Sequence, residues 1–204
     1  MKGVPMDVHG SLVFAGDSVT DCGRREDPAG LGSGYVRELA STLVPRGVRV
    51  ANAGVGGDRL ADLGDRWEVD VVARHPDHVS VLIGINDTWR LQDTGERSDH
   101  GAFAERYRLL LSALPSTTRI VLLEPFVLPV TEDQERWRDD LDPRIEVVHL
   151  LAEEFGAVLV PIDAILHRLA RTLGAPALAA DGVHPTESGH REIAAAWSRT
   201  VGAA

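Results

Sequence analysis

The sequence contains very little sulfur with which to build cross-links or metal sites. Its 204 residues include one cysteine, Cys22, so they can form neither an intrachain disulfide nor a CxxC motif. A disulfide-stapled fold and a zinc ribbon are therefore excluded. We expect Cys22 to pack beneath its turn rather than to react.

Long hydrophobic runs are also missing. No window approaches the ~20 apolar residues that cross a bilayer. The first ten residues hold one lysine but no apolar stretch of the length that a signal peptide needs. These absences predict a cytoplasmic protein that has no membrane partner.

Positive charge is scarce as well. Lys and Arg total 21 against 31 Asp and Glu, and the resulting net charge of −10 repels phosphate backbones and anionic lipid surfaces. We therefore expect no nucleic-acid partner. Because 44% of the residues are hydrophobic and 25% are charged, the composition is that of an ordinary globular protein, and the length suits a single domain over residues 1–204.

Five short apolar runs predict the strands. They are bounded by Gly, Pro, Asn or Asp and cover residues 11–15, 48–51, 79–83, 120–123 and 157–160. Each run suits a strand that is buried on both faces of a parallel sheet. Stretches with helical spacing, such as Tyr35, Leu39 and Leu43, alternate with these runs. The alternation predicts an α/β fold, a three-layer α/β/α sandwich around a five-stranded parallel sheet.

Two prolines set the expected helix boundaries. Pro143 interrupts the helical pattern of residues 136–155, where we expect two helices, because proline breaks or kinks a helix interior. Pro185 is tolerated only near a helix start, so the last helix is expected to begin near Thr186 or Ser188.

Polar residues follow the predicted strands, at the sheet edge where parallel α/β folds collect their functional residues. After the first strand, Gly16 permits a sharp turn that would present Ser18 as a nucleophile; the alternative is that Asp17 and Ser18 only cap a helix. After the second, the Gly-rich turn at residues 54–57 offers N–H groups to an anion or an oxyanion. This turn is not a dinucleotide site, because Arg59 stands where G-x-G-x-x-G requires glycine.

Two further motifs complete this set. Asn86 and Asp87 follow the third strand, and Asp181 stands three residues before His184 on a segment that Pro185 keeps out of a helix. Such a carboxylate can hold one imidazole nitrogen and leave the other free as a base, although an isolated pair of this kind is more often a surface ion pair. Together the motifs supply a nucleophile, oxyanion donors, a base and its orienter.

A metal site is the competing interpretation of the C-terminal motif. It would join His190 to Asp181 and His184, but the three residues lack the i, i+4 spacing of helical zinc motifs. We therefore expect no metal.

In these motifs the sequence resembles the SGNH hydrolases, also called the GDSL family, whose name lists a Ser, Gly, Asn and His held in separate blocks. Ser18, Gly57, Asn86 and His184 match the four blocks in order, and the resemblance covers residues 12 to about 198. It implies a flavodoxin-like sandwich and hydrolysis of esters or thioesters without a metal or organic cofactor. Ser18 would be the nucleophile, His184 the base and Asp181 its orienter. The oxyanion hole would comprise the N–H groups of Ser18 and Gly57 and the Asn86 amide.

Longer strings around the first and third blocks, at residues 16–24 and 83–90, are similar to those of SGNH acetylxylan esterases and related carbohydrate deacetylases. This similarity implies a serine esterase for short-chain esters, chiefly acetyl esters of carbohydrates, with a small-molecule or oligosaccharide substrate as its partner. Two alternatives remain, a thioesterase or lysophospholipase for longer acyl chains and a catalytically idle carbohydrate-binding relative. Exposed apolar helix faces could also support a homo-oligomer.

Candidate substrate contacts lie beside these blocks. Trp89 could stack on a sugar ring and Arg90 could fix a polar group, while the alternative for Trp89 is a buried anchor for its loop. Asp17 is a further candidate, although its position, like those of Asp87 and Asp163, suits hydrogen bonds that fix loops. The irregular segments 24–32, 90–100 and 126–134 are candidate specificity walls.

Overall fold

The computed structural model describes residues 7–95 and 99–202. Within these residues, five parallel strands form one sheet in the order β2-β1-β3-β4-β5. The strands are β1 (Ser11–Gly16), β2 (Arg49–Gly54), β3 (His78–Leu82), β4 (Arg119–Leu123) and β5 (Val158–Val160). The order reverses at β1, and a reversal of this kind opens a crevice beyond the carboxyl ends of the strands.

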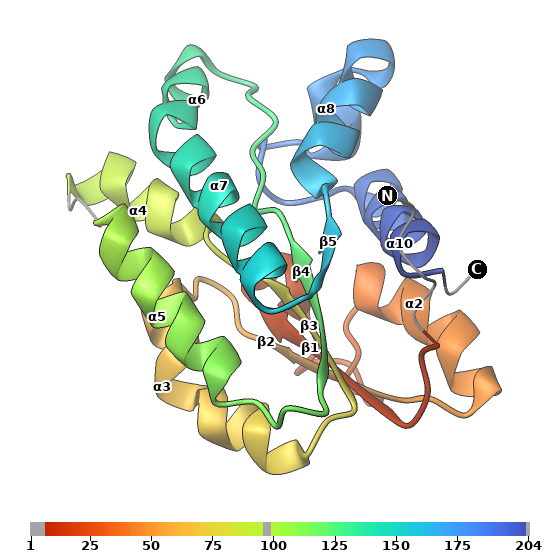
Figure 1. The fold of residues 1–204 in the computed structure, drawn as a ribbon. Helices are drawn as coiled ribbons and strands as arrows, with labels where there is room; N and C mark the ends of the chain where they lie inside the picture. Colours follow the sequence, from red (N-terminus) through yellow and green to blue (C-terminus); the bar gives the residue numbers. More distant parts are fainter. Residues whose placement is uncertain (1–6, 96–98, 203–204) are drawn as a thin grey trace.

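Helices cover both faces of the sheet and produce three layers (Figure 1). One face packs against α2 (Tyr35–Leu43), α8 (Ile162–Leu173) and α10 (Glu187–Val201), and the other against α3 (Leu60–Asp70), α5 (His100–Ser112) and α7 (Arg138–Glu154). Side chains alternate along each strand, so Phe14 of β1 enters the first core while Val13 and Ala15 enter the second. The predicted α/β/α sandwich is confirmed.

Shorter elements bring several segments to the same edge. The helices α1 (Ser18–Asp21), α4 (Ile85–Thr94) and α6 (Glu132–Arg136) come after the carboxyl ends of β1, β3 and β4, and α9 (Ala175–Leu178) precedes α10. The 3₁₀ turns η1 (Val44–Arg46) and η2 (Val72–Arg74) precede β2 and β3. No helix in the described part of the chain is both long and apolar enough to cross a membrane. Residues 1–6, part of the stretch considered above for a signal peptide, lie outside the described residues.

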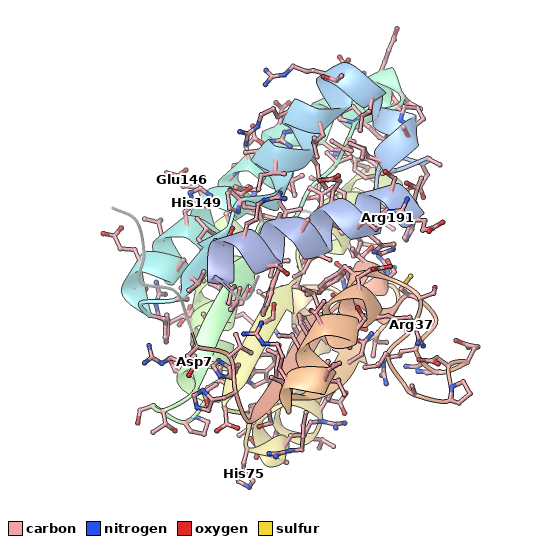
Figure 2. The ribbon with its side chains drawn as sticks, turned by 90° about the vertical axis from the view of Figure 1, so that its right-hand side faces the viewer. Asp7, Arg37, His75, Glu146, His149 and Arg191 are labelled. Carbon is pink, nitrogen blue, oxygen red and sulfur yellow. The ribbon has the colours of Figure 1, made fainter. Side chains whose placement is uncertain are left out.

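The C-terminal helix, α10, is hydrogen-bonded to β3, the central strand of the sheet. Figure 2 shows α10 lying beside α2, with Arg191 and Arg37 on these two helices. Trp197 of α10 is fully buried, and its Nε1 donates a hydrogen bond to Ser80 Oγ of β3 at 3.0 Å. The helix begins as predicted, because Thr186 Oγ1 accepts a hydrogen bond from the Gly189 N–H at 3.2 Å. This attachment fixes the end of the segment that carries Asp181 and His184.

Two sequence-based boundaries are wrong. The helix boundary within residues 136–155 lies at Trp137, and α7 continues through Pro143. Proline removes one backbone hydrogen bond and costs about 3 kcal/mol in a helix interior. The buried Asp140–Arg144 ion pair, at 3.0 Å, spans the proline, and Leu141 and Val148 are fully buried, so tertiary packing outweighs that cost. The second strand also runs to Gly54 rather than ending at Ala51, because residues 52–54 pair in register with the end of β1.

Candidate active site

The turn after β1 places Ser18 at the first position of α1. Asp17 is the N-cap of this helix, and its Oδ1 accepts a hydrogen bond from the Val19 N–H at 3.0 Å. A side chain at Gly16 cannot be accommodated, since a Cβ there would lie 2.2 Å from the Leu82 carbonyl oxygen. The two interpretations of this motif are therefore compatible, because the turn that caps the helix is also the turn that exposes Ser18.

The Ser18 turn is tied to the neighbouring strand. A Cβ at Gly54 would lie 2.3 Å from the Asp21 nitrogen, so β2 approaches α1 as closely as backbone atoms permit. Arg66 of α3 donates hydrogen bonds to the carbonyl oxygens of Gly16 at 3.0 Å and Ala53 at 2.6 Å. Its Nε also donates to Asp58 Oδ2 at 2.6 Å. One guanidinium thus joins the carboxyl ends of β1 and β2 to the Gly-rich turn.

Three side chains from opposite ends of the chain form a continuous hydrogen-bonded chain. Ser18 Oγ lies 2.9 Å from His184 Nε2, and His184 Nδ1 lies 2.6 Å from Asp181 Oδ2. A proton on Nδ1 donates to the carboxylate and leaves Nε2 as the acceptor for the hydroxyl. A serine hydroxyl bonded to an imidazole that a carboxylate orients is the arrangement that activates serine as a nucleophile.

The Asp181 carboxylate is held as an anion. Partial burial is the largest single influence and opposes its ionisation, but the hydrogen bonds from the His184 ring and from the backbone of the turn together outweigh that effect. Two backbone N–H groups, of His184 at 2.7 Å and Val183 at 3.0 Å, also donate to its Oδ1. The pKa of Asp181 therefore lies below its ordinary value. An anion there orients the ring and can stabilise a positive charge on it.

Hydrogen-bond donors for an oxyanion come from three separate segments. Asn86, near the start of α4, donates through Nδ2 to the Asp58 carbonyl oxygen at 3.0 Å. Within the described residues, its second amide hydrogen and the Gly57 N–H have no acceptor. Ser18 is the first residue of α1 and has no intrahelical acceptor for its N–H. The three donors proposed from the sequence thus lie at one edge of the sheet, where each has an N–H that can donate to a ligand oxygen.

Buried carboxyl groups underlie this edge. The Asp17 side chain is 1% exposed, so in this structure it caps α1 instead of facing a substrate. Burial raises the pKa of Asp17 to about 7, although the Val19 N–H and His184 oppose the change. Burial also raises the pKa of Asp87, whose Oδ2 accepts from the Leu60 N–H at 3.0 Å and so fixes the start of α3. The structural roles expected for both carboxylates agree with these contacts.

Trp89 and Arg90, the two candidate substrate contacts on α4, differ in exposure. The Trp89 ring is partly exposed and packs against two rings, His184 at a centroid distance of 6.0 Å and Trp137 at 5.4 Å. Arg90 is exposed on α4. The hydrogen bond from Arg59 is the main influence that lowers the pKa of Asp62, and the positive charge of Arg90 lowers this pKa further. Trp89 therefore contacts His184 of the candidate site and remains partly exposed, whereas Arg90 lies on the outer surface.

The three segments proposed as specificity walls differ in secondary structure and in exposure. Residues 24–32 form a partly exposed loop in which Arg24 Nε donates to the Gly54 carbonyl oxygen at 2.5 Å. In the second wall, residues 90–94 belong to α4, residues 99 and 100 begin α5 and its cap, and residues 96–98 lie outside the described residues. The third begins in the core, since Phe126, Val127 and Leu128 are 2% exposed or less, whereas residues 129–133 are partly or fully exposed. The buried side chains of residues 126–128 cannot line a substrate channel, so the expectation is wrong for these three residues and stays a prediction for the rest of the segment.

His190 and Cys22 do not join the Ser18 cluster. His190 Nδ1 accepts a hydrogen bond from the Tyr35 N–H at 3.2 Å, and its Nε2 lies 3.4 Å from Cys22 Sγ. Burial lowers the pKa of His190 to about 4, which keeps the ring neutral. In the part of the chain that the structure describes, no group of three or more His, Cys, Asp or Glu side chains is placed to hold a metal ion. Asp163, for which we expect a structural role, forms a two-point ion pair with Arg138, at 2.6 and 3.0 Å.

One residue beside the site was not singled out from the sequence. Gln134 of α6 is buried, and its Nε2 donates a hydrogen bond to the Asp181 carbonyl oxygen at 2.7 Å. A signal was present, because Thr131 and Gln134 have the spacing of a capping box. That pattern predicts a local helix cap and gives no indication of a contact 47 residues away.

Comparisons with known proteins find similar sequences over nearly the whole chain. The model of the GDSL-like Lipase/Acylhydrolase family matches residues 14–192. An acetylxylan esterase from Geobacillus stearothermophilus is 38% identical over 205 residues, which covers 94% of this chain and 93% of that protein.

Solved structures give the same result. The crystal structure of a catalytic mutant of Axe2, an acetylxylan esterase from the same organism, has a TM-score of 0.88 at 35% identity and covers 97% of both chains. LAE5, an alpha/beta hydrolase enzyme from the metagenome of Lake Arreo, Spain, has a TM-score of 0.84 at 31% identity over 94% of each chain.

Proposed function

The chain belongs to the GDSL-like lipase/acylhydrolase family and is a carboxylic ester hydrolase, and we propose that it removes short acyl groups, chiefly acetyl, from carbohydrate hydroxyls through Ser18. The observation that carries this proposal is the hydrogen-bonded chain from Ser18 Oγ through His184 to Asp181, with distances of 2.9 and 2.6 Å. The similarity to an acetylxylan esterase over nearly the whole chain supports the substrate class.

The proposed reaction starts when Ser18 Oγ attacks the carbonyl carbon of the ester. His184 Nε2 accepts the hydroxyl proton as the new C–O bond forms, and Asp181 stabilises the imidazolium through Nδ1–H. The tetrahedral intermediate collapses, the bond to the sugar oxygen breaks, and His184 returns the proton to that oxygen. A water molecule then attacks the acyl-enzyme in the same way and releases the carboxylic acid and free Ser18.

The negative charge of the tetrahedral oxygen would be met by three donors, the N–H groups of Ser18 and Gly57 and the Asn86 amide. The contact between Asn86 and the Asp58 carbonyl holds the amide before any substrate arrives. Donors that are oriented in advance need no reorganisation when charge develops, which is why they stabilise a transition state more than water does.

The exposure of the site supports a bulky alcohol portion. The side chains of His184 and Asp181 are 47% and 49% exposed, so a sugar bearing the ester can approach the serine from solvent. Trp89, partly exposed beside His184, offers an aromatic face on which a sugar ring can stack. The neutral acetylated sugar also suits a protein whose net charge is −10.

Acetate release provides the decisive test. Wild type and Ser18→Ala are compared on acetylated xylo-oligosaccharides, p-nitrophenyl esters of increasing chain length and acyl-CoA, and wild type is expected to prefer acetyl esters while the variant is inactive. A fluorophosphonate probe should add one adduct, mapped to Ser18. An octanoyl optimum would favour the thioesterase or lysophospholipase alternative. Full activity of Ser18→Ala would overturn the assignment, and the absence of both acetate release and labelling would favour a binding protein.

A further inference from the structure

The segment that carries Asp181 and His184 is attached to the segment that follows β4. The Leu128 N–H donates to the Gly182 carbonyl oxygen at 2.8 Å, and Gln134 Nε2 donates to the Asp181 carbonyl oxygen at 2.7 Å. These bonds join parts of the chain that lie about 50 residues apart in sequence, at the place where the proposed base meets its carboxylate.

The Gln134 carboxamide has a fixed orientation. It is 8% exposed, and its Oε1 accepts a hydrogen bond from the Val130 N–H at 2.9 Å while its Nε2 donates to Asp181. A rotation of the amide by 180° would set the NH₂ group against an N–H and the oxygen against a carbonyl, so both contacts would become repulsive. The side chain therefore acts as a rigid bridge between residue 130 and residue 181.

The close approach of the bridge depends on Gly182. This residue has a φ of +84°, and a Cβ there would lie 2.6 Å from Gln134 Oε1 and 2.7 Å from the Leu128 carbonyl oxygen. Any side chain would push the loop away from Gln134. The glycine and the glutamine therefore form one packing unit.

Among the residues that the structure describes, none provides the Asp181 side chain with a comparable long-range anchor. Its Oδ1 accepts from the N–H groups of Val183 and His184, two and three residues away, so these bonds hold the turn together but do not place it relative to Ser18. Placement depends on contacts that reach outside the turn. The Gln134 bond is the side-chain contact of this kind at the residue that orients the base.

We propose that Gln134 is a positioning residue for the ester hydrolysis: by holding the Asp181 backbone it keeps the carboxylate aligned with His184 and His184 within reach of Ser18. The inference rests on the proposed roles of these three residues. A displacement of about 1 Å at a reacting group can cost roughly 100-fold in rate, so the loss of the bridge is expected to lower kcat while substrate binding is kept.

The first test replaces Gln134 by methionine, which has similar length but forms neither hydrogen bond. Gln134→Met is expected to lower kcat on p-nitrophenyl acetate at least tenfold with less than a twofold change in KM, and to slow fluorophosphonate labelling of Ser18 in parallel. Glu135→Gln, the exposed neighbour on α6, is the matched control and should behave as wild type. A Gln134→Met enzyme with wild-type kcat would overturn the proposal.

The second test uses Gln134→Glu, which separates positioning from a general structural effect. When ionised, the introduced carboxylate cannot donate to the Asp181 carbonyl; when protonated, its O–H can, and burial favours the protonated form. The Asp181 carboxylate on the facing turn stays ionised, since its pKa lies below the ordinary value. The ratio of the Gln134→Glu kcat to the wild-type kcat should therefore rise at least threefold from pH 9 to pH 6, whereas the Gln134→Met ratio stays constant.

Other outcomes are equally decisive. A constant ratio for Gln134→Glu, with a lowered melting temperature, would mean that Gln134 only supports the fold, and would reject the proposal. If Gln134→Met does not fold, the pH dependence of Gln134→Glu decides alone. The proposed function fails separately, if Ser18→Ala keeps the wild-type rate of acetate release.

Discussion

The Asn86 side chain reaches across the sheet edge and donates a hydrogen bond to the backbone carbonyl oxygen of Asp58 at 3.0 Å. This contact joins the segment after β3 to the Gly-rich turn after β2. It uses one amide hydrogen and leaves the second for a ligand. The pairing therefore holds a side-chain donor at the turn that carries the Gly57 N–H. We propose that these two groups, together with the Ser18 N–H, bind the oxyanion.

Removal of the Asn86 amide should affect the transition state more than substrate binding. Asn86→Ala is expected to lower kcat by about 10²–10³, with less than a threefold change in KM. Asn86→Asp, which keeps the size but loses both donors, should show a comparable fall. Steady-state kinetics on p-nitrophenyl acetate measure both parameters. An effect confined to KM would assign Asn86 to binding instead.

Trp89 is expected to contribute to binding of the sugar. A stacking contact of about 0.5–1.5 kcal/mol corresponds to a two- to tenfold rise in KM when it is lost. Trp89→Ala should therefore raise KM for acetylated xylo-oligosaccharides by this factor and change KM for p-nitrophenyl acetate much less. Trp137→Phe is the control, because Trp137 is buried behind Trp89. An equal loss of kcat on both substrates would mean that Trp89 acts by holding His184.

Asp17 should make the folded state less stable at alkaline pH. Burial raises its pKa from 3.8 to about 7 in the folded protein, so the fold favours the protonated form. Its contribution to stability is complete below pH 4 and is lost as the pH rises through 7. Asp17→Asn keeps an acceptor for the Val19 N–H but cannot ionise. Thermal melts should show that the stability of the variant rises relative to that of wild type between pH 5 and pH 8, by up to about 3 kcal/mol in unfolding free energy. A pH-independent difference would contradict this cause.

His190 should have the opposite effect at acid pH. Burial lowers its pKa from 6.5 to about 4, so the unfolded chain binds the proton more tightly than the folded protein does. Stability from the neutral ring is present above pH 6.5 and is lost as the pH falls towards 4. His190→Gln can accept from the Tyr35 N–H but does not titrate. Its melting temperature should fall less steeply than that of wild type between pH 6.5 and pH 4.5, and parallel slopes would exclude His190 as the source.

Much of the fold was predictable because its signals are local. Short apolar runs separated by turn residues identified the strands, and the carboxyl ends of parallel strands meet at one edge whatever the details of packing. The spacing of Asp181 and His184 likewise allows their contact within a single turn. Local patterns gave wrong predictions where packing opposed them, since α7 continues as a helix through Pro143 and Phe126 is buried in the core.

The sequence by itself determined which chemical groups are present, in what order they occur, and that they follow the carboxyl ends of the strands. The tertiary structure alone decided that Ser18 Oγ lies 2.9 Å from His184 Nε2, although the two residues are 166 positions apart. It also decided that Gln134, which accepts a hydrogen bond locally from the Val130 N–H, donates its other hydrogen bond to the distant Asp181. The reason is physical: turns and caps depend on neighbouring residues, whereas contacts between distant segments depend on strand pairing and helix packing, which involve the whole core at once.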